Sequence, residues 1–234
     1  MGDDGAHQEE PPFPLTNVDI WVLSQTDDEF KKHDWADLEQ IIGEALRAVR
    51  TIFIAPPLML APLSADTNNL SVLQRKPSDL RRYMKWTADI KAQYGSISQY
   101  ILANRLPQSW GQPPFAPESQ VPFESPADYK VLLNDWPYGL APGITHIVVW
   151  SRTLIPTDPA TGDMTPESRA RVQDFVKRCF VDALGPGGEK RVLWFKNWVA
   201  LQSVRSLEHF HVLVRHVGDD TLEGWTGERR GRPE

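Results

Sequence analysis

Two histidines near the C-terminal end of the sequence are the residues best suited to chemistry. His209 and His211 lie in the segment LEHFHVLV at 207–214, which has the composition of a β-strand. Because side chains alternate across a sheet, both imidazoles project from one face and Glu208 projects from the other. Two adjacent imidazoles can hold a phosphate, bind a metal, or act as nucleophile and acid/base groups. A His-x-His pair is equally compatible with a structural role.

A second candidate is the turn NDWPYG at 134–139. Asp135 could act as an acid/base group or bind a cationic substrate, or it could merely stabilise an Asx-type turn. Trp136 and Tyr138 add two aromatic rings. Pro137 favours an extended conformation at Trp136, and Gly139 permits a positive φ. The sequence therefore predicts a rigid turn that brings a carboxylate and two rings to the site.

Basic residues occur in two places where a phosphate could be neutralised. Lys196 and Arg205 flank the histidines in the sequence. Residues 71–105 contain seven bases and two acids, which predicts either a phosphate-binding surface or an ordinary solvated helix face. The residues proposed for tRNA or phosphate binding are Arg75, Lys76, Arg81, Arg82, Lys85 and Lys91.

The composition is that of a globular protein with a sizeable core, with 41% hydrophobic and 24% charged residues. The net charge of −6 argues against nucleic-acid binding as the sole purpose. Cys179 is the one cysteine, which excludes an internal disulfide and favours a reducing compartment. We find no secretion signal and no apolar run long enough for a membrane span, so we expect a cytoplasmic protein.

The pattern of apolar residues predicts a single α+β domain over residues 15–217, with an antiparallel sheet and packed helices. We expect helices over 35–49 and from about 80 to Pro107, the second kinked at Gly95. Residues 51–60 favour a short strand. The core unit, residues 144–215, contains strands at 144–150, 191–195 and 207–214 and a helix starting at Thr165. Residues 1–14 and 218–234 are expected to be disordered or flexible tails.

The order of these elements resembles that of histidine-triad (HIT-like) proteins over residues 144–215. The matching positions are Asn197, the Gln202-Ser203-Val204 segment and the two histidines, with His209 in place of that family's nucleophile. Leu207 stands where the family has its first histidine, and the spacing from Gln202 is one residue longer. The resemblance implies a HIT-like core, but the departures put ordinary nucleotidyl transfer in doubt.

Longer motifs resemble the fungal N-acetylglucosamine-induced protein 1-like family. They are Asp34-Trp35, NDWPYG at 134–139, GITHIVVWSR at 143–152 and WFKNWVALQSVRSLEHFHVLVR at 194–215. The resemblance extends to fungal arginine-containing cyclodipeptide synthases, which join arginine from its aminoacyl-tRNA to a second amino acid as a diketopiperazine. It implies catalytic roles for His209, His211, Asp135 and Glu208. The residues expected to bind substrate are Trp136, Tyr138, Lys196, Asn197, Trp198, Gln202, Ser203 and Arg205.

Three functions therefore remain open. The first is the tRNA-dependent cyclodipeptide synthase, with arginyl-tRNA as substrate and no DNA or membrane partner. The second is a histidine-triad-like hydrolase or transferase acting on a nucleotide or sugar nucleotide, and the third is a non-catalytic regulatory protein. No cofactor is expected. A metal site built from His146, His209 and His211 is conceivable, but the sequence lacks a cysteine pair and HExxH spacing, so no metal is expected either. The oligomeric state is not determined by the sequence.

Overall fold

A four-stranded antiparallel sheet organises the computed structural model, which describes residues 11–42, 70–197, 204 and 206–229. The strands are β1 (Tyr129–Leu133), β2 (Ile144–Ser151), β3 (Val192–Phe195) and β4 (Glu208–Arg215), in the order β1-β2-β4-β3. The long strands β2 and β4 pair along their whole length, from Ile144 opposite Arg215 to Ser151 opposite Glu208. The strand that carries the two histidines is therefore held on both sides.

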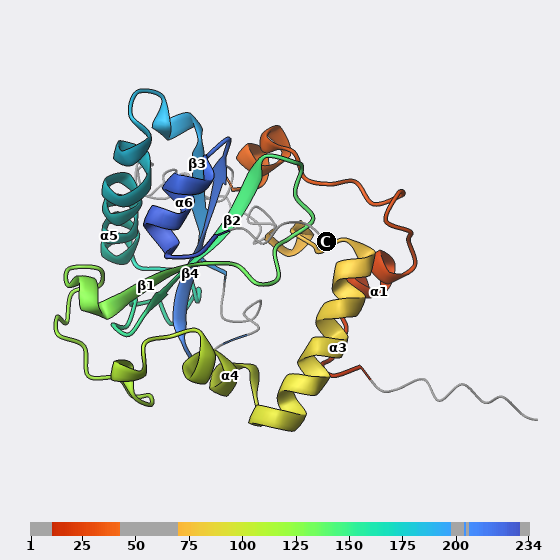
Figure 1. Cartoon of the computed structure of the whole chain (residues 1–234), viewed down its shortest axis with the longest axis horizontal. Helices are drawn as coiled ribbons and strands as arrows, with labels where there is room; N and C mark the ends of the chain where they lie inside the picture. Colours follow the sequence, from red (N-terminus) through yellow and green to blue (C-terminus); the bar gives the residue numbers. More distant parts are fainter. Residues whose placement is uncertain (1–10, 43–69, 198–203, 205, 230–234) are drawn as a thin grey trace, which may run out of the picture.

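One face of the sheet is covered by helices α5 (Pro166–Val176) and α6 (Asp219–Thr226), as Figure 1 shows. Thr165 caps α5 by accepting a hydrogen bond from the backbone N–H of Ser168, and Pro166 occupies the first turn. Glu208 lies on this face at the start of β4, but the centre of the face is apolar. Its buried strand residues include Ile147, Val149, Phe210, Val212 and Val214, packed against Phe175 and Phe180.

The opposite face is covered by several separate elements: α1 (Asn17–Leu23), a helical stretch at 35–42, α3 (Pro77–Tyr94) and α4 (Ile97–Asn104). Helix α4 packs directly on Val148 and Trp150. Residues 35–42 pack on Phe195 and Leu213. Helix α3 instead packs against α1, farther from the strands (Figure 1). A space is thus left between α3 and the sheet.

Short turns complete the described structure. The single-turn helices are η2 (Leu70–Val72), η3 (Gln108–Trp110), η4 (Pro126–Asp128), the π-turn η5 (Lys177–Val181), η6 (Asp182–Leu184) and η7 (Gly188–Lys190). No helix among the described residues is both long and apolar enough to cross a membrane.

The structure confirms the strands predicted at 144–150, 191–195 and 207–214 and the helix that follows Thr165. The predicted helix at 35–49 is helical over 35–42, and its remainder lies outside the described residues, as do residues 1–10 and the predicted strand at 51–60. The α+β class with an antiparallel sheet is therefore correct.

Three expectations were wrong. The helix predicted from about 80 to 107 is two helices, because Gly95 has a φ of 79° and ends α3, after which Ser96 caps α4. The segment 218–234 was predicted to be flexible, yet it contains α6, since Leu222 and Thr226 are buried. Residues 11–14, expected to be disordered, pack on α3 through Phe13, whose ring lies 5.7 Å from that of Tyr83.

Candidate functional site

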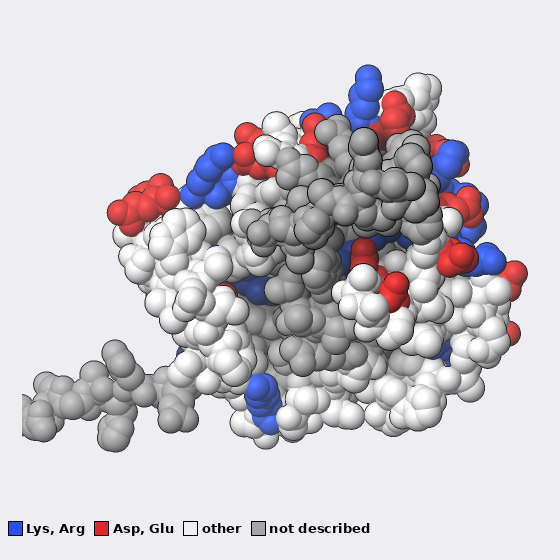
Figure 2. Space-filling model, turned by 180° about the vertical axis from the view of Figure 1, so that it is seen from behind, with Lys and Arg blue, Asp and Glu red and all other residues white. Residues whose placement is uncertain are grey.

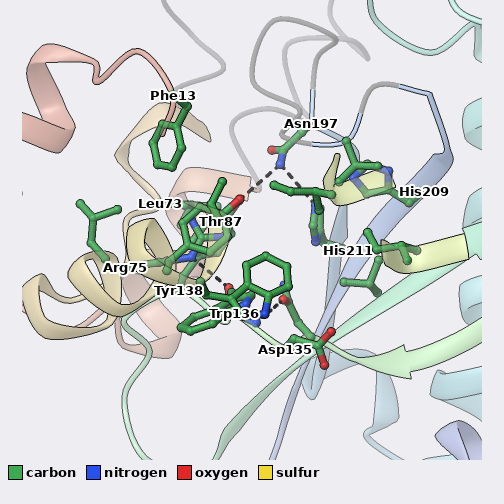
Figure 3. Close-up of a pocket in the computed structure, with 18 of the residues that line it drawn as sticks. Phe13, Leu73, Arg75, Thr87, Asp135, Trp136, Tyr138, Asn197, His209 and His211 are labelled. Atoms are coloured by element: carbon green, nitrogen blue, oxygen red, sulfur yellow. Dashed lines mark hydrogen bonds between the residues drawn. The ribbon is translucent and has the colours of Figure 1, made fainter. Parts of the chain in front are cut away.

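The space between α3 and the sheet is a cavity of about 730 Å³. Its walls come from α1, α3, α4, the 134–139 turn and the histidine-bearing face of the sheet (Figure 3). Aromatic rings form much of the lining: Phe13, Tyr83, Trp86, Trp136, Tyr138 and Trp150. The polar groups include His209, His211 and Asn197. A concave site with aromatic walls and a few convergent polar groups is typical of small-molecule binding.

His209 lies in the cavity wall with one ring nitrogen fixed. Its Nδ1 lies 2.8 Å from the backbone carbonyl oxygen of Leu207, so Nδ1 carries the proton and donates it there. The Nε2 atom is then an acceptor. The ring packs against Trp150, directly opposite on β2, with centroids 4.7 Å apart. Burial lowers the pKa of His209 to about 4, so at neutral pH the imidazole is uncharged and able to accept a proton.

His211 belongs to a buried chain of polar side chains. Its Nε2 lies 3.2 Å from Nδ2 of Asn197, and its Nδ1 lies 3.0 Å from Nε2 of His146. Because the Asn197 amide donates, His211 Nε2 accepts and His211 Nδ1 donates to His146. The same amide donates to the Tyr138 hydroxyl at 3.3 Å. His211 is therefore fully used in hydrogen bonds and suits a positioning role better than that of a nucleophile.

Burial and nearby positive charge keep the histidines of this chain neutral. Burial, with a smaller contribution from the positive charge of Arg75, lowers the pKa of His146 to about 3. Burial also holds the pKa of His211 well below its usual range, with His146, His209, Arg75 and Lys196 as smaller causes. All three imidazoles on this face are thus uncharged at neutral pH. Among the described residues, no group of three or more His, Cys, Asp or Glu side chains is arranged to hold a metal ion.

Asp135 lies at the edge of the cavity, already paired. Its carboxylate lies 2.9 Å from a guanidinium nitrogen of Arg105 on the segment that follows α4. Arg105 also pairs with Glu228 at 2.6 Å, and Glu228 accepts a hydrogen bond from the backbone N–H of Leu133 at 2.8 Å. Burial raises the pKa of Asp135, although Arg105 opposes this shift. The structure therefore gives Asp135 a resident guanidinium partner.

The 134–139 turn presents its rings to the cavity, as the sequence predicts. Asn134 stabilises the turn by accepting a hydrogen bond from the backbone N–H of Trp136 at 2.9 Å. Tyr138 stacks on His146, with ring centroids 5.0 Å apart. Trp136 contacts Tyr83 of α3 at 5.5 Å. The turn thus joins the histidine chain to the aromatic wall of α3.

The sequence predicts Glu208 as a catalytic residue and Lys196 as a substrate-binding residue, and in the structure the two pair with each other. Glu208 lies on the face opposite His209, as expected, and pairs with the buried Lys196 at 3.4 Å. Burial raises the pKa of Glu208, with Lys196 acting in the other direction. Neither of them is among the cavity-lining residues. Four of the predicted substrate-binding residues lie outside the described residues: Trp198, Gln202, Ser203 and Arg205.

The six basic residues proposed to bind tRNA have different surroundings. Arg75 and Lys91 both line the cavity. Lys76 and Arg82 both pair with Asp79, and Arg81 donates to the backbone carbonyl of Leu23. Lys85 is exposed. On the face shown in Figure 2, basic and acidic side chains of the described residues alternate along the rim rather than forming a patch.

Sequence reasoning missed several residues of the cavity. Tyr83 and Trp86 are three positions apart on the face of α3 that the apolar pattern marks as buried, which is the signal that could have found them. Arg105 and Asn134 carried no separate signal. His146 was considered only as a metal ligand, and the structure shows it as the partner of His211.

The fold and the site define an α+β protein with an aromatic-lined cavity on one face of its sheet, and the comparisons with known proteins agree with this class. The chain matches the family model "Protein of unknown function (DUF3605)" over residues 64–215. Because this match spans more than half of the chain, the protein belongs to the DUF3605 family.

Named relatives of the chain are fungal. It is 29% identical over 184 residues to N-acetylglucosamine-induced protein 1 of Candida albicans, covering 69% of this chain and 70% of that protein. It is 33% identical over 119 residues to the uncharacterized protein YPL067C of Saccharomyces cerevisiae, covering 50% of this chain and 59% of that protein. The expected relation to N-acetylglucosamine-induced protein 1 is confirmed by the first match.

A solved structure shares the fold. The crystal structure of HTC1 superposes with a TM-score of 0.52 at 22% sequence identity, covering 82% of this chain and 91% of that chain. At this identity the likeness concerns the fold alone. The histidine-triad relation of the core and the cyclodipeptide synthase activity stay predictions.

Proposed function

We propose that the protein is an aminoacyltransferase that joins arginine, delivered as arginyl-tRNA, to a second aminoacyl group to form a cyclic dipeptide. The observation that carries the proposal is His209, a neutral imidazole with Nδ1 anchored on the Leu207 carbonyl, in the wall of an aromatic-lined cavity. The motif resemblance to arginine-containing cyclodipeptide synthases supplies the substrate class. The cavity volume, about 730 Å³, is suited to two aminoacyl groups.

The proposed reaction consists of two acyl transfers. In the first, the α-amine of one aminoacyl group attacks the ester carbonyl of the other, forming a peptide bond while the ribose hydroxyl of the tRNA leaves. His209 Nε2 takes the proton from the attacking amine and returns it to the departing hydroxyl. In the second transfer, the remaining free amine attacks the remaining ester and closes the six-membered ring. Each step returns His209 to its neutral form.

Recognition of the arginine side chain would differ from the simplest expectation. Arg105 already occupies the Asp135 carboxylate, so Asp135 is not vacant for a substrate guanidinium. The faces of Trp86 and Trp136, which line the cavity, offer cation–π contacts instead. We therefore assign arginine binding to the ring of Trp136, with Asp135 and Arg105 shaping the edge of the cavity.

Expression of the full chain in a bacterial host, followed by mass spectrometry of the medium, tests the proposal. We expect an arginine-containing diketopiperazine from the wild type and a loss of product of roughly 100-fold or more in His209→Asn. His216→Asn is the matched control, because His216 is exposed and outside the cavity lining. Folded wild-type protein without any diketopiperazine would remove the proposal. Equal product from His209→Asn and the wild type would remove the role of His209.

A histidine-triad-like transferase is the second candidate, favoured by one specific contact. Anchoring Nδ1 on the Leu207 carbonyl would orient Nε2 for nucleophilic attack as well as for proton transfer. Leu207, however, is buried at the place of the first histidine of the triad. Incubation with a panel of nucleotides and sugar nucleotides, followed by a search for a phosphorus adduct on His209, separates this reaction from acyl transfer.

The non-catalytic alternative rests on the relative from Candida albicans, whose name says that it is induced by N-acetylglucosamine. A regulatory protein of the amino-sugar response would need the cavity intact but not His209 Nε2. Retention of full cellular function in both His209→Asn and His211→Asn would favour this alternative. The cytoplasmic location belongs with the main proposal, since it follows from the substrate proposed.

A further inference from the structure

Arg75 places a positive charge in the wall of the cavity without a carboxylate partner among the described residues. Its Nε donates to the backbone carbonyl of Trp136 at 3.2 Å. Its guanidinium carbon lies 4.0 Å from the ring centroid of Tyr83 and 6.0 Å from that of Tyr138. These contacts use the faces of the guanidinium and one N–H group. The terminal nitrogens Nη1 and Nη2 have no recorded hydrogen bond within the described part of the chain.

The other charged residues of the described lining have partners of their own, and Lys91 donates to the backbone carbonyl of Pro12. Arg105 pairs with Asp135, and Asp19 accepts hydrogen bonds from the backbone N–H and the hydroxyl of Thr16. Arg75 is half-buried, so its charge is partly removed from water while its terminal donors stay unpaired. Such a group is stabilised by an anion.

Neutral hydrogen-bonding groups lie close to this charge. The Tyr138 hydroxyl accepts from Asn197, which leaves its own O–H free to donate to a ligand. His146, stacked on Tyr138, is uncharged, and Arg75 is one of the causes that lower its pKa. A guanidinium with a neutral donor beside it is an arrangement that binds phosphate oxygens, in the fork geometry that arginine favours.

We propose that Arg75 binds the phosphate of a nucleotide whose base stacks on the ring of Trp86 in the cavity wall. Stacking on such rings is tolerant of base identity. The cavity volume falls within the range of roughly 300–1,000 Å³ that is usual for small-molecule sites. This nucleotide subsite is inferred from the contacts of Arg75. The inference does not depend on which reaction His209 performs.

The location of this subsite adds a geometric constraint. Figure 3 shows Arg75 beside Tyr138, on the side of the cavity away from His209. A phosphate held by Arg75 would therefore not meet His209 Nε2. The histidine would instead face the sugar or a group attached to it. This arrangement is the one expected for transfer of an acyl group from a ribose hydroxyl, and it disfavours attack by His209 on the same phosphate.

Isothermal titration of the purified full chain with adenosine 5′-monophosphate, adenosine and inorganic phosphate tests the subsite. We expect the monophosphate to bind at least about tenfold more tightly than adenosine, a difference of about 1.4 kcal/mol. Arg75→Met, which retains much of the packing on Tyr83, should abolish this difference. Arg75→Lys should retain part of it. Arg81→Met is the matched control, because Arg81 is exposed on helix α3, six residues after Arg75, and is not among the cavity-lining residues.

Two outcomes overturn the proposal. One is a wild type that binds adenosine as tightly as the monophosphate, or binds neither, a result that needs no variant. The other is an Arg75→Met protein that still discriminates between the two ligands like the wild type. Thermal unfolding checks that each variant is folded. Failure to detect a diketopiperazine would remove the proposed reaction but would leave the contrast between Arg75→Met and Arg81→Met intact.

Discussion

The two faces of the sheet differ sharply, although they are built from alternate residues of the same strands. Under α5 and α6, Phe210 and Val212 of β4 are completely buried among apolar side chains. On the other face, the neighbouring residues His209 and His211 line a cavity. One strand therefore serves both as a structural core and as the floor of a site, because its side chains alternate with a period of two.

The comparison shows how polar groups are kept in a buried place. The core under α5 and α6 (the dry face) is almost wholly apolar, and its Trp194 donates the ring N–H to Gln173 at 2.8 Å. The cavity face buries three imidazoles, and it satisfies His211 through Asn197 and His146 while it leaves all three uncharged. Mutations on the dry face should therefore act mainly on stability. Mutations on the cavity face should act on function and on the pH dependence of stability.

The largest effect is expected from the dry face. Phe210→Ala removes a ring that packs against Phe123 at 5.4 Å and Phe175 at 6.0 Å, and should lower the free energy of unfolding by about 3–5 kcal/mol. His209→Asn, one residue away on the other face, should cost about 1–2 kcal/mol. Urea denaturation followed by circular dichroism measures both. Equal losses from the two variants would contradict the division between the faces.

The next effect concerns pH. The pKa of His209 is about 4 and that of His146 about 3 in the folded protein, against about 6.5 in an unfolded chain. Below pH 6.5 the unfolded chain binds protons that the folded protein does not, so stability is complete above that pH and falls as the pH approaches 4. Each buried histidine contributes up to about 1.4 kcal/mol per pH unit.

Denaturation curves at pH 7 and pH 5 test this sign. The wild type should be less stable at pH 5, and His209→Gln should lose less stability than the wild type over the same interval, because glutamine does not titrate. The exposed His216, replaced by Asn, serves as the control. A wild type that gains stability on acidification would show that these imidazoles are protonated in the folded protein.

A smaller effect is expected from Glu228, which binds the end of the edge strand β1. Glu228 binds both Arg105 and the backbone N–H of Leu133, so Glu228→Ala leaves two donors without this partner and should cost about 1–2 kcal/mol. Glu223→Ala provides the comparison, since Glu223 pairs only with the exposed Arg229 among the described residues. Thermal unfolding ranks the two variants. If Glu223→Ala lowered the unfolding temperature more than Glu228→Ala, the contacts of Glu228 would not stabilise this edge of the sheet.

The smallest effect is expected on the outer surface of α3. Arg82 pairs with Asp79 while its side chain is 74% exposed, so Arg82→Ala should change stability by no more than about 0.5 kcal/mol. The same variant should bind adenosine 5′-monophosphate like the wild type. A clear loss of nucleotide affinity in Arg82→Ala would shift the binding surface from the cavity to the outside of the helix.

The sequence predicted the elements whose pattern is local. The strand at 207–214 alternates clearly, and Thr165-Pro166 is a strong helix start, so both were found. The shared face of His209 and His211 followed from the same alternation. The cavity itself could not be predicted, because it depends on α3 standing away from the sheet, which is a matter of packing between distant segments.

The failures have the same physical origin. A polar tail such as residues 218–234 gives a weak helical signal, and α6 is held by the burial of Leu222 rather than by its propensity. The pairing of Asp135 with Arg105 and Glu228 joins residues far apart in the chain.

Helix α6 gives the segment after Gly218 an importance that its polar composition does not suggest. A premature stop codon after Gly218 would spare the whole sheet and both histidines. It would nevertheless remove Leu222 from the dry core and Glu228 from Arg105. We expect such a truncation to behave as a loss-of-function allele.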